Sequence, residues 1–336
     1  MKFGLAIMND FPPGTVPAQQ VALLREQVQV AGGAGIESIW VLQHYLGNMP
    51  TLQPLQLLSA LAADSGQLML GTNMLILPLA HPVAVAEDFA TLDHISDGRV
   101  LAGLGLGYRE NEFESFGIPL ADRVGRYEES IEIIRALWSG DEVSFAGQHF
   151  ALARQRISLK PVQPGGPRIW IGAGAHRTGA RRAARLGDAW MVPPHVDPAR
   201  LATVLEWYRA ERQALGRPPA DEIAVRRELL LDEDADQARE LGQAARGALS
   251  RQYGQFNAPD QTGTYRHLDS DTAAREVADQ SYLFTDPDRA VASLRALEAA
   301  GVTYVVLRMQ WYNLPHKQVL RTLELFRNHV APAFPP

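Results

Sequence analysis

Short apolar runs alternate with helical patterns along the chain. Eight runs are candidate buried strands, and most of them have the continuous apolar character of parallel strands that are covered on both faces. These candidate strands span residues 3–8, 36–42, 68–77, 100–106, 168–171, 189–192, 223–231 and 302–309. Because each run is followed by a helical pattern, the chain reads as a repeated strand–helix unit.

The helices are indicated by apolar residues that recur every three or four positions. One such helix covers residues 120–138 and another covers residues 319–330. In the first, the apolar positions are Leu120, Val124, Tyr127, Ile131, Ile134 and Trp138; in the second they are Val319, Leu323, Phe326 and Val330. Gly35, Gly187 and Gly301 each stand between a helix and a strand, where we expect left-handed helix ends.

Eight strand–helix repeats predict a (β/α)8 TIM barrel, with a doubly wound open sheet as the alternative. Residues 1–336 are expected to form a single barrel domain with two excursions. Residues 141–167 contain an alternating segment around a glycine and read as a hairpin. Residues 254–286 form a polar insertion with scattered aromatic residues, which is either a lid over a ligand or a surface excursion.

The amino-acid composition excludes several classes of binding partner and active site. The 336 residues are 46% hydrophobic and 21% charged, with a net charge of −6 and no cysteine. An acidic chain is a poor partner for nucleic acid or a membrane surface. The absence of cysteine excludes thiolate nucleophiles and cysteine-bound metals and fits a cytoplasmic location. No metal is expected, because the nine histidines lack metal-ligand spacing.

Candidate chemistry lies at the carboxyl ends of the strands, which meet at one mouth of a barrel. His44 follows the second strand, where a neutral imidazole could move protons or simply cap a loop. The segment from Gly172 to Arg177 follows the fifth strand and opens a helix. Exposed amides at a helix start favour an anion such as phosphate.

Several motifs, taken together, resemble the bacterial luciferase-like family of flavin-dependent monooxygenases and oxidoreductases. They lie at residues 39–45, 70–82, 86–99, 103–117, 126–138 and 167–174. The similarity covers about residues 1–195 and resumes at 285–330. The resemblance implies a luciferase-like barrel, and it also implies a homodimer.

The resemblance also implies roles for individual residues. His44 matches the family's acid–base histidine, and Asn73–Met74 matches a non-proline cis peptide bond behind the flavin ring. The residues expected to contact the cofactor are Asn73, Met74, Gly105, Tyr108, Gly172, Ala173, Gly174, Ala175, His176 and Arg177. Those expected to contact the substrate are Asn9, Gln310 and Trp311, together with the 254–286 insertion.

Three departures from luciferase weigh against light emission. Gln43 replaces a glutamate, Gly105 replaces a cysteine, and Leu106 replaces an arginine that helps to bind phosphate; Arg177 could supply that charge instead. We therefore expect a monooxygenase that uses O2 and reduced FMN from a separate flavin reductase on a small organic molecule. The alternatives are a deazaflavin-dependent dehydrogenase or reductase and a flavin-binding barrel without catalysis; a phosphosugar lyase or isomerase is a more distant one.

Overall fold

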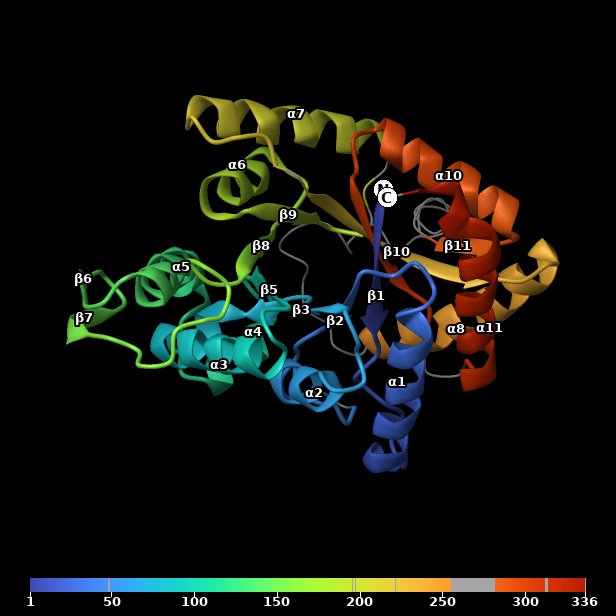
Figure 1. The fold of residues 1–336 in the computed structure, drawn as a ribbon, viewed down its shortest axis with the longest axis horizontal. Coiled ribbons are helices and arrows are strands. Elements are labelled where there is room, and N and C mark those ends of the chain that lie inside the picture. The colour runs from blue at the N-terminus through green and yellow to red at the C-terminus, as the bar shows by residue number, and fades with distance from the viewer. Residues whose placement is uncertain are drawn as a thin grey trace.

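A closed parallel barrel forms the centre of the molecule (Figure 1). The computed structural model describes residues 1–335 except 48, 195, 197, 221, 255–281, 312 and 313. Each barrel strand pairs in parallel with its neighbours, and β1 pairs with both β2 and β12. The predicted barrel is confirmed. Its strands are β1 (Lys2–Ile7), β2 (Ser38–Val41), β3 (Met69–Thr72), β5 (Val100–Gly105), β8 (Arg168–Gly172), β9 (Ala189–Val192), β10 (Ile223–Leu231) and β12 (Tyr304–Arg308).

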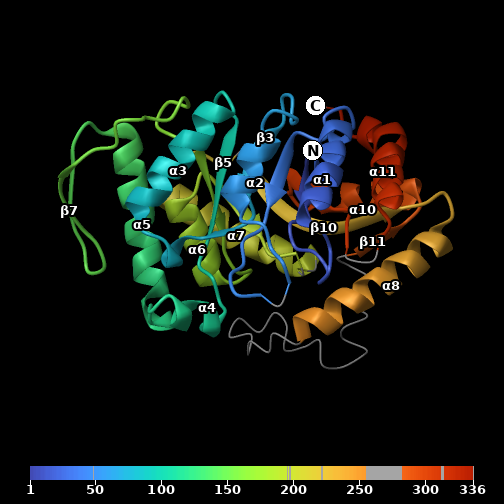
Figure 2. The same ribbon diagram turned by 90° about the horizontal axis from the view of Figure 1, so that it is seen from below.

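Helices surround this barrel and cover its outer face (Figures 1 and 2). They are α1 (Pro17–Ala31), α2 (Pro54–Leu61), α3 (Pro82–Ile95), α4 (Glu110–Ser115), α5 (Arg123–Ser139), α6 (Arg177–Leu186), α7 (Pro198–Ala214), α8 (Ala235–Gly254), α10 (Pro287–Ala299) and α11 (His316–Leu325). Shorter turns are η1 (Leu77–Leu79), η2 (Leu120–Asp122), η4 (Phe326–Val330) and η5 (Ala331–Ala333). No helix among the described residues is both long and apolar enough to cross a membrane.

The two helices that the spacing of apolar residues predicts, over residues 120–138 and 319–330, form largely as expected. The predicted face of α5 is buried from Tyr127 to Trp138, and all four apolar residues of the last helix are buried. Leu120 and Val124 are only half-buried, because Leu120 lies in the short turn η2 and α5 begins at Arg123.

Four short strands lie outside this closed path. The strand predicted at 68–77 is divided, since the Asn73–Met74 peptide bond is cis and β4 (Leu75–Ile76) follows it. The cis bond implied by the resemblance is thus confirmed. β6 (Val143–Ala146) and β7 (Ala151–Gln155) form an antiparallel hairpin within 141–167, at one side of the molecule in Figure 2.

The fourth, β11 (Tyr282–Thr285), corrects the predicted insertion. It pairs with the second half of β10, and Asp286 caps α10. Phe284 is buried and packs edge-on against Trp311. The last residues of the 254–286 insertion therefore belong to the sheet, because its aromatic residues are strand-forming and pack in the core. Residues 255–281, the rest of the expected lid, lie outside the described residues.

Glycine conformations agree with the prediction at two of the three helix ends. Gly35 and Gly301 have φ values of 76° and 95°, in the left-handed region. Gly187 has a φ of −97°, so the prediction there was wrong. A Cβ at Gly187 would lie 2.6 Å from Ile171 Cγ1. This position therefore needs glycine for space and not for its backbone conformation.

An aromatic layer fills the interior of the barrel. The ring centroids of Trp40 and Trp170 are 4.8 Å apart, and those of Trp170 and Tyr304 are 5.1 Å apart. A Cβ at Gly4 or Gly71 would lie within 2.5 Å of Trp40, so these glycines make room for its indole. Burial raises the pKa of the Tyr304 hydroxyl, so this group stays neutral. The layer closes the barrel below its mouth.

Candidate functional site

A small cavity opens above the aromatic layer, at the carboxyl ends of the strands. It is lined by Ala6, Ile7, Met8, Trp40, Leu42, Asn73, Arg226 and Arg308. Most of these side chains are apolar, and the polar groups come from β10, β12 and the segment after β3. A mostly apolar cavity with a few convergent polar groups is typical of a small-molecule site.

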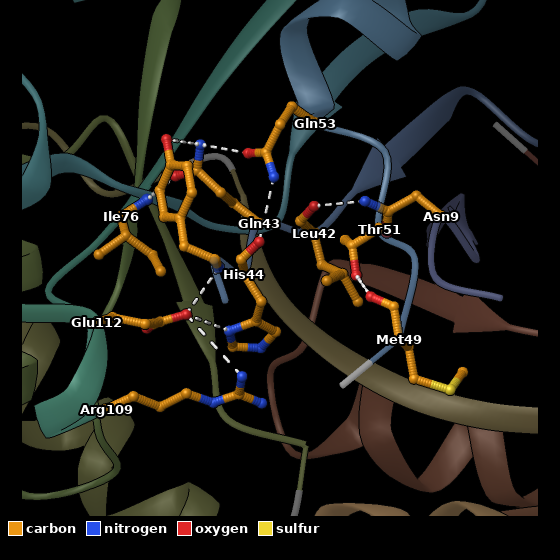
Figure 3. Close-up of polar contacts among 11 residues, drawn as sticks. Asn9, Leu42, Gln43, His44, Met49, Thr51, Gln53, Ile76, Arg109 and Glu112 are labelled. Atoms are coloured by element: carbon orange, nitrogen blue, oxygen red, sulfur yellow. Dashed lines mark hydrogen bonds and ion pairs between the residues drawn. The ribbon is translucent and has the colours of Figure 1, made fainter. Parts of the chain in front are cut away.

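His44 lies at this end of the barrel, two residues after Leu42 of the cavity wall. Its Nδ1 is 3.3 Å from Oε1 of Glu112, and the same oxygen accepts a hydrogen bond from the Tyr45 backbone N–H at 2.8 Å (Figure 3). Glu112 is fully buried at the middle of α4, and Arg109 Nη1 is 3.9 Å from its Oε1. A carboxylate at Nδ1 orients the imidazole and favours a proton on that nitrogen. Nε2 is then the ring nitrogen that can accept a proton.

Two amides hold the loop on which His44 lies. Gln43 accepts a hydrogen bond from the Ile76 N–H at 2.7 Å and donates to the Tyr45 hydroxyl at 3.0 Å and to Gln53 Oε1 at 3.3 Å. Gln53 in turn donates to the backbone oxygen of His44 at 3.2 Å. Burial and the charge of Glu112 raise the pKa of the Tyr45 hydroxyl. The glutamine that replaces the luciferase carboxylate thus ties β4 to the loop of His44.

Tyr108 lies beside the same imidazole. The two rings meet edge-to-face with centroids 6.2 Å apart, and the Arg109 guanidinium lies 5.9 Å from the Tyr108 ring centroid. Tyr108 is 39% exposed, so its ring is open at the rim of the site. The structure therefore brings Tyr108, predicted as a cofactor contact, next to His44.

Met74 explains two of the predicted cofactor glycines. A Cβ at Gly105 would lie 2.8 Å from Met74 Cβ, and a Cβ at Gly172 would lie 2.6 Å from Met74 Cγ. Gly103 is tighter still, with a Cβ position 1.7 Å from the Thr72 backbone oxygen. These glycines of β5 and β8 make room for the segment that carries the cis bond. The nearest atoms to these glycines therefore belong to Thr72 and Met74 of the same chain.

The segment Gly172–Arg177 runs from β8 into α6, as the anion-site prediction requires. His176 is the N-cap residue, and its Nδ1 accepts a hydrogen bond from the Gly179 N–H at 3.1 Å. Burial and the charges of Arg182 and Arg200 lower the pKa of His176. The side chain of Arg177 is exposed at the first turn. The first-turn amides and this arginine suit a phosphate; its binding stays a prediction.

The predicted substrate residues are not among those that line this cavity, and their contact with a substrate stays a prediction. Asn9 is fully buried, and its amide donates to the backbone oxygens of Leu42 and Leu52. Gln310 Oε1 accepts a hydrogen bond from Gln27 of α1 at 2.9 Å. Trp311 is fully buried and packs against β11. In this structure these three side chains join the barrel to the elements around it.

Sequence reasoning missed three charged residues at the site. Arg109 and Glu112 follow β5 by four and seven positions, and the assignment of strand-end residues stopped at Tyr108. The sequence feature that could have indicated them is the charged segment after a glycine-rich strand, in which Arg109 and Glu112 are three positions apart. Arg226 lies inside a predicted strand, two residues before Glu228. Residues two apart on a strand lie on the same face, so these two charges indicate a strand face that is partly polar.

Residues 1–304 match the family described as luciferase-like monooxygenase. The chain belongs to this family. Among luciferase-like relatives, it is 28% identical over 318 residues to the F420-dependent hydroxymycolic acid dehydrogenase of Mycobacterium tuberculosis, a match that covers 90% of this chain and 82% of that protein. It is also 29% identical over 215 residues to the 4-hydroxyprotoasukamycin monooxygenase of Streptomyces nodosus subsp. asukaensis, covering 62% of this chain and 58% of that protein.

Among solved luciferase-like structures, monooxygenase RslO1 from Streptomyces bottropensis has a TM-score of 0.89 and 25% identity over the full length of both chains. Both dehydrogenases and monooxygenases therefore occur among proteins similar to this one. The protein is an oxidoreductase of the luciferase-like family, which uses a flavin or a deazaflavin.

Proposed function

We propose that the protein is an FMN-dependent monooxygenase that oxygenates a small organic molecule with O2. The observation that carries this proposal is the mostly apolar cavity at the strand ends, whose lining includes Trp40 and Leu42, two residues before His44. An apolar wall excludes water, which protects reactive oxygen chemistry from side reactions. The likeness to monooxygenase RslO1 across the whole chain supports the same reading.

The residues at the mouth of the barrel have the chemical character that FMN binding requires. Gly172–Arg177 would hold its phosphate, and Asn73–Met74 would lie behind its ring. Bound reduced FMN supplies the electrons and reacts with O2; the chain positions and shields it. His44 would accept or return a proton at Nε2, because Glu112 faces Nδ1. A separate flavin reductase would supply the reduced cofactor, and the protein would act as a homodimer.

Cofactor titration tests this proposal directly. The purified protein is titrated without oxygen with reduced FMN and, separately, with the reduced deazaflavin F420, and air is then admitted with candidate substrates. We expect FMN to bind and substrate oxidation to require O2. Tight binding of F420 alone, with substrate oxidised in the absence of O2, would refute the proposal.

A second candidate is F420-dependent hydride transfer. It is favoured by the relatives that match most of this chain, which include F420-dependent dehydrogenases of hydroxymycolic acid and of glucose 6-phosphate. Since hydride transfer needs no O2, the same titration separates it from oxygenation.

Two variants test the roles proposed for His44 and Arg177. His44→Gln should lower turnover by about 100-fold or more if the imidazole moves protons. A flavin carrier without catalysis would bind its cofactor unchanged and have no turnover to lose. Arg177→Ala should weaken FMN by about ten-fold and leave riboflavin, which has no phosphate, unaffected. Equal effects on the two flavins would remove Arg177 from the phosphate site.

A further inference from the structure

Three side chains that follow β5 are arranged around the imidazole of His44, which follows β2. Glu112 lies at Nδ1, Tyr108 packs edge-on against the ring, and Arg109 contacts both of them. Arg109 is the N-cap residue of α4 and Glu112 is the third residue of that helix, so their spacing places both side chains on one side of it. Figure 3 shows that Arg109 and His44 meet the same carboxylate oxygen of Glu112.

The carboxylate of Glu112 is shielded from water, because its side chain is 1% exposed and that of Arg109 is 4% exposed. Its Oε1 lies 2.8 Å from the Tyr45 nitrogen, 3.3 Å from His44 Nδ1 and 3.9 Å from Arg109 Nη1. Its Oε2 is buried and has no hydrogen-bond partner in the part of the chain that the structure describes. A buried carboxylate stays ionised only where hydrogen bonds and opposite charge replace its hydration. Among the described residues, Arg109 is the only arginine or lysine within 4.0 Å of this carboxylate.

The pair of Glu112 and His44 can hold one proton or two. With one proton, the carboxylate is ionised, Nδ1 carries the proton and Nε2 is free. A second proton gives either a protonated carboxyl group or an imidazolium ring, and the two sites share it as a coupled pair. The fixed positive charge of Arg109 favours the state with one proton, because it attracts the ionised carboxylate and repels an imidazolium ring.

We propose that Arg109 is a positioning residue that keeps Nε2 of His44 free to accept a proton at neutral pH. The proposal deepens the proposed function and rests on it, because His44 transfers protons only in that reaction. The two phenols in contact with the pair do not supply this charge. Burial and the charge of Glu112 raise the pKa of the Tyr45 hydroxyl, so this group stays neutral, and Tyr108 contacts the imidazole through its ring.

Arg109 also restrains the second neighbour of the imidazole. Its guanidinium carbon lies 5.9 Å from the ring centroid of Tyr108, within the range in which a cation is attracted to an aromatic ring. The Tyr108 ring in turn meets the imidazole at an interplanar angle of 87°. One arginine therefore contacts both the carboxylate at Nδ1 and the ring that packs against His44. A change at Arg109 acts on the charge of the pair and on the packing around it, and the experiment has to separate these two effects.

Nitrogen-15 NMR of the His44 ring tests the proposal on the protein without cofactor. At pH 7.5 we expect Nδ1 of the wild type to be protonated and Nε2 to be unprotonated. Arg109→Met should raise the midpoint pH of Nε2 protonation by at least about one unit, a ten-fold change in the proton equilibrium, and Arg109→Lys should stay close to the wild type because it keeps the charge. Arg321→Met is the matched control, since Arg321 pairs with Glu324 at the same spacing on the exposed side of α11, and it should leave the midpoint unchanged.

A wild-type ring that carries its proton on Nε2 at pH 7.5 would overturn the proposal, even if the arginine variants fail to fold. So would a folded Arg109→Met protein with the wild-type midpoint. An equal rise in Arg109→Met and Arg109→Lys would also overturn it, because the packing of Arg109 and not its charge would then control the ring. Since the spectra need no cofactor, the expected midpoints together with unchanged turnover in His44→Gln would uphold the role of Arg109 while the proposed function of His44 fails.

Discussion

Gln43 offers a sharp test of how the loop of His44 is held. Its amide is 8% exposed and uses both ends: Oε1 accepts from the Ile76 N–H, and Nε2 donates to the Tyr45 hydroxyl and Gln53 Oε1. Gln43→Glu preserves the shape and the acceptor but removes both donated hydrogen bonds. It also brings a carboxylate oxygen against an amide oxygen. We expect the free energy of unfolding to fall by about 2–4 kcal/mol at pH 8.

The pH dependence gives this prediction a distinctive signature. Burial should raise the pKa of the introduced carboxyl above its usual range. The neutral acid can donate a hydrogen bond again, so the loss of stability should shrink as the pH is lowered toward 5. Urea unfolding at pH 8 and pH 5 measures both values. Gln213→Glu, on the exposed surface of α7, is the control and should shift stability by less than about 0.5 kcal/mol. A Gln43→Glu protein with wild-type stability at pH 8 would refute the reasoning.

Three further predictions concern other parts of the site. Glu112→Gln removes the charge that orients His44 and should lower turnover about 10–100-fold, and unaltered turnover would show that the carboxylate does not position the ring. Gly103→Ala should destabilise the protein by about 3 kcal/mol in urea because its methyl group meets the Thr72 oxygen, whereas Gly32→Ala, which meets only ordinary contacts, serves as the control. His176→Asn replaces a titrating cap by a non-titrating one. Because the folded pKa of His176 is lowered, the stability it gives is present above its usual pKa of about 6.5 and is lost as the pH falls below that value. Thermal melts at pH 7.5 and 5.5 should show a smaller loss for the variant, and equal losses would contradict this assignment.

The barrel could be predicted because its strands are buried on both faces. A continuous apolar run such as residues 100–106 is stable in a globular protein only where both of its faces are buried, and every predicted run overlaps an observed strand. β11 was missed for the opposite reason. It is only four residues long and follows a polar segment, so nothing local separates Tyr282–Thr285 from the preceding residues. Its place is decided by its pairing with β10.

The direction of a side chain beyond a strand end could not be predicted. Gln310 and Trp311 come two and three positions after the end of β12, and strand ends meet at the mouth, so both are expected to contact the substrate. The structure joins Gln310 to Gln27 of α1, a partner 283 positions away, which the sequence pattern did not indicate. Once a strand ends, the alternation of faces no longer constrains the next residues, and distant partners decide where they point.

Charged residues inside an apolar strand carry more information than polar residues at its end. Arg226, Arg227 and Glu228 follow one another in β10, and the structure separates them by face. Arg227 points away from the cavity and donates to the backbone oxygens of Pro194 and Val196, and burial lowers its pKa to about 10. Arg226 and Glu228 face the interior, where a charge is tolerated only beside a counter-charge or a ligand. Arg227 thus holds the loop after β9, whereas Arg226 is paired with Glu228 on the face toward the cavity.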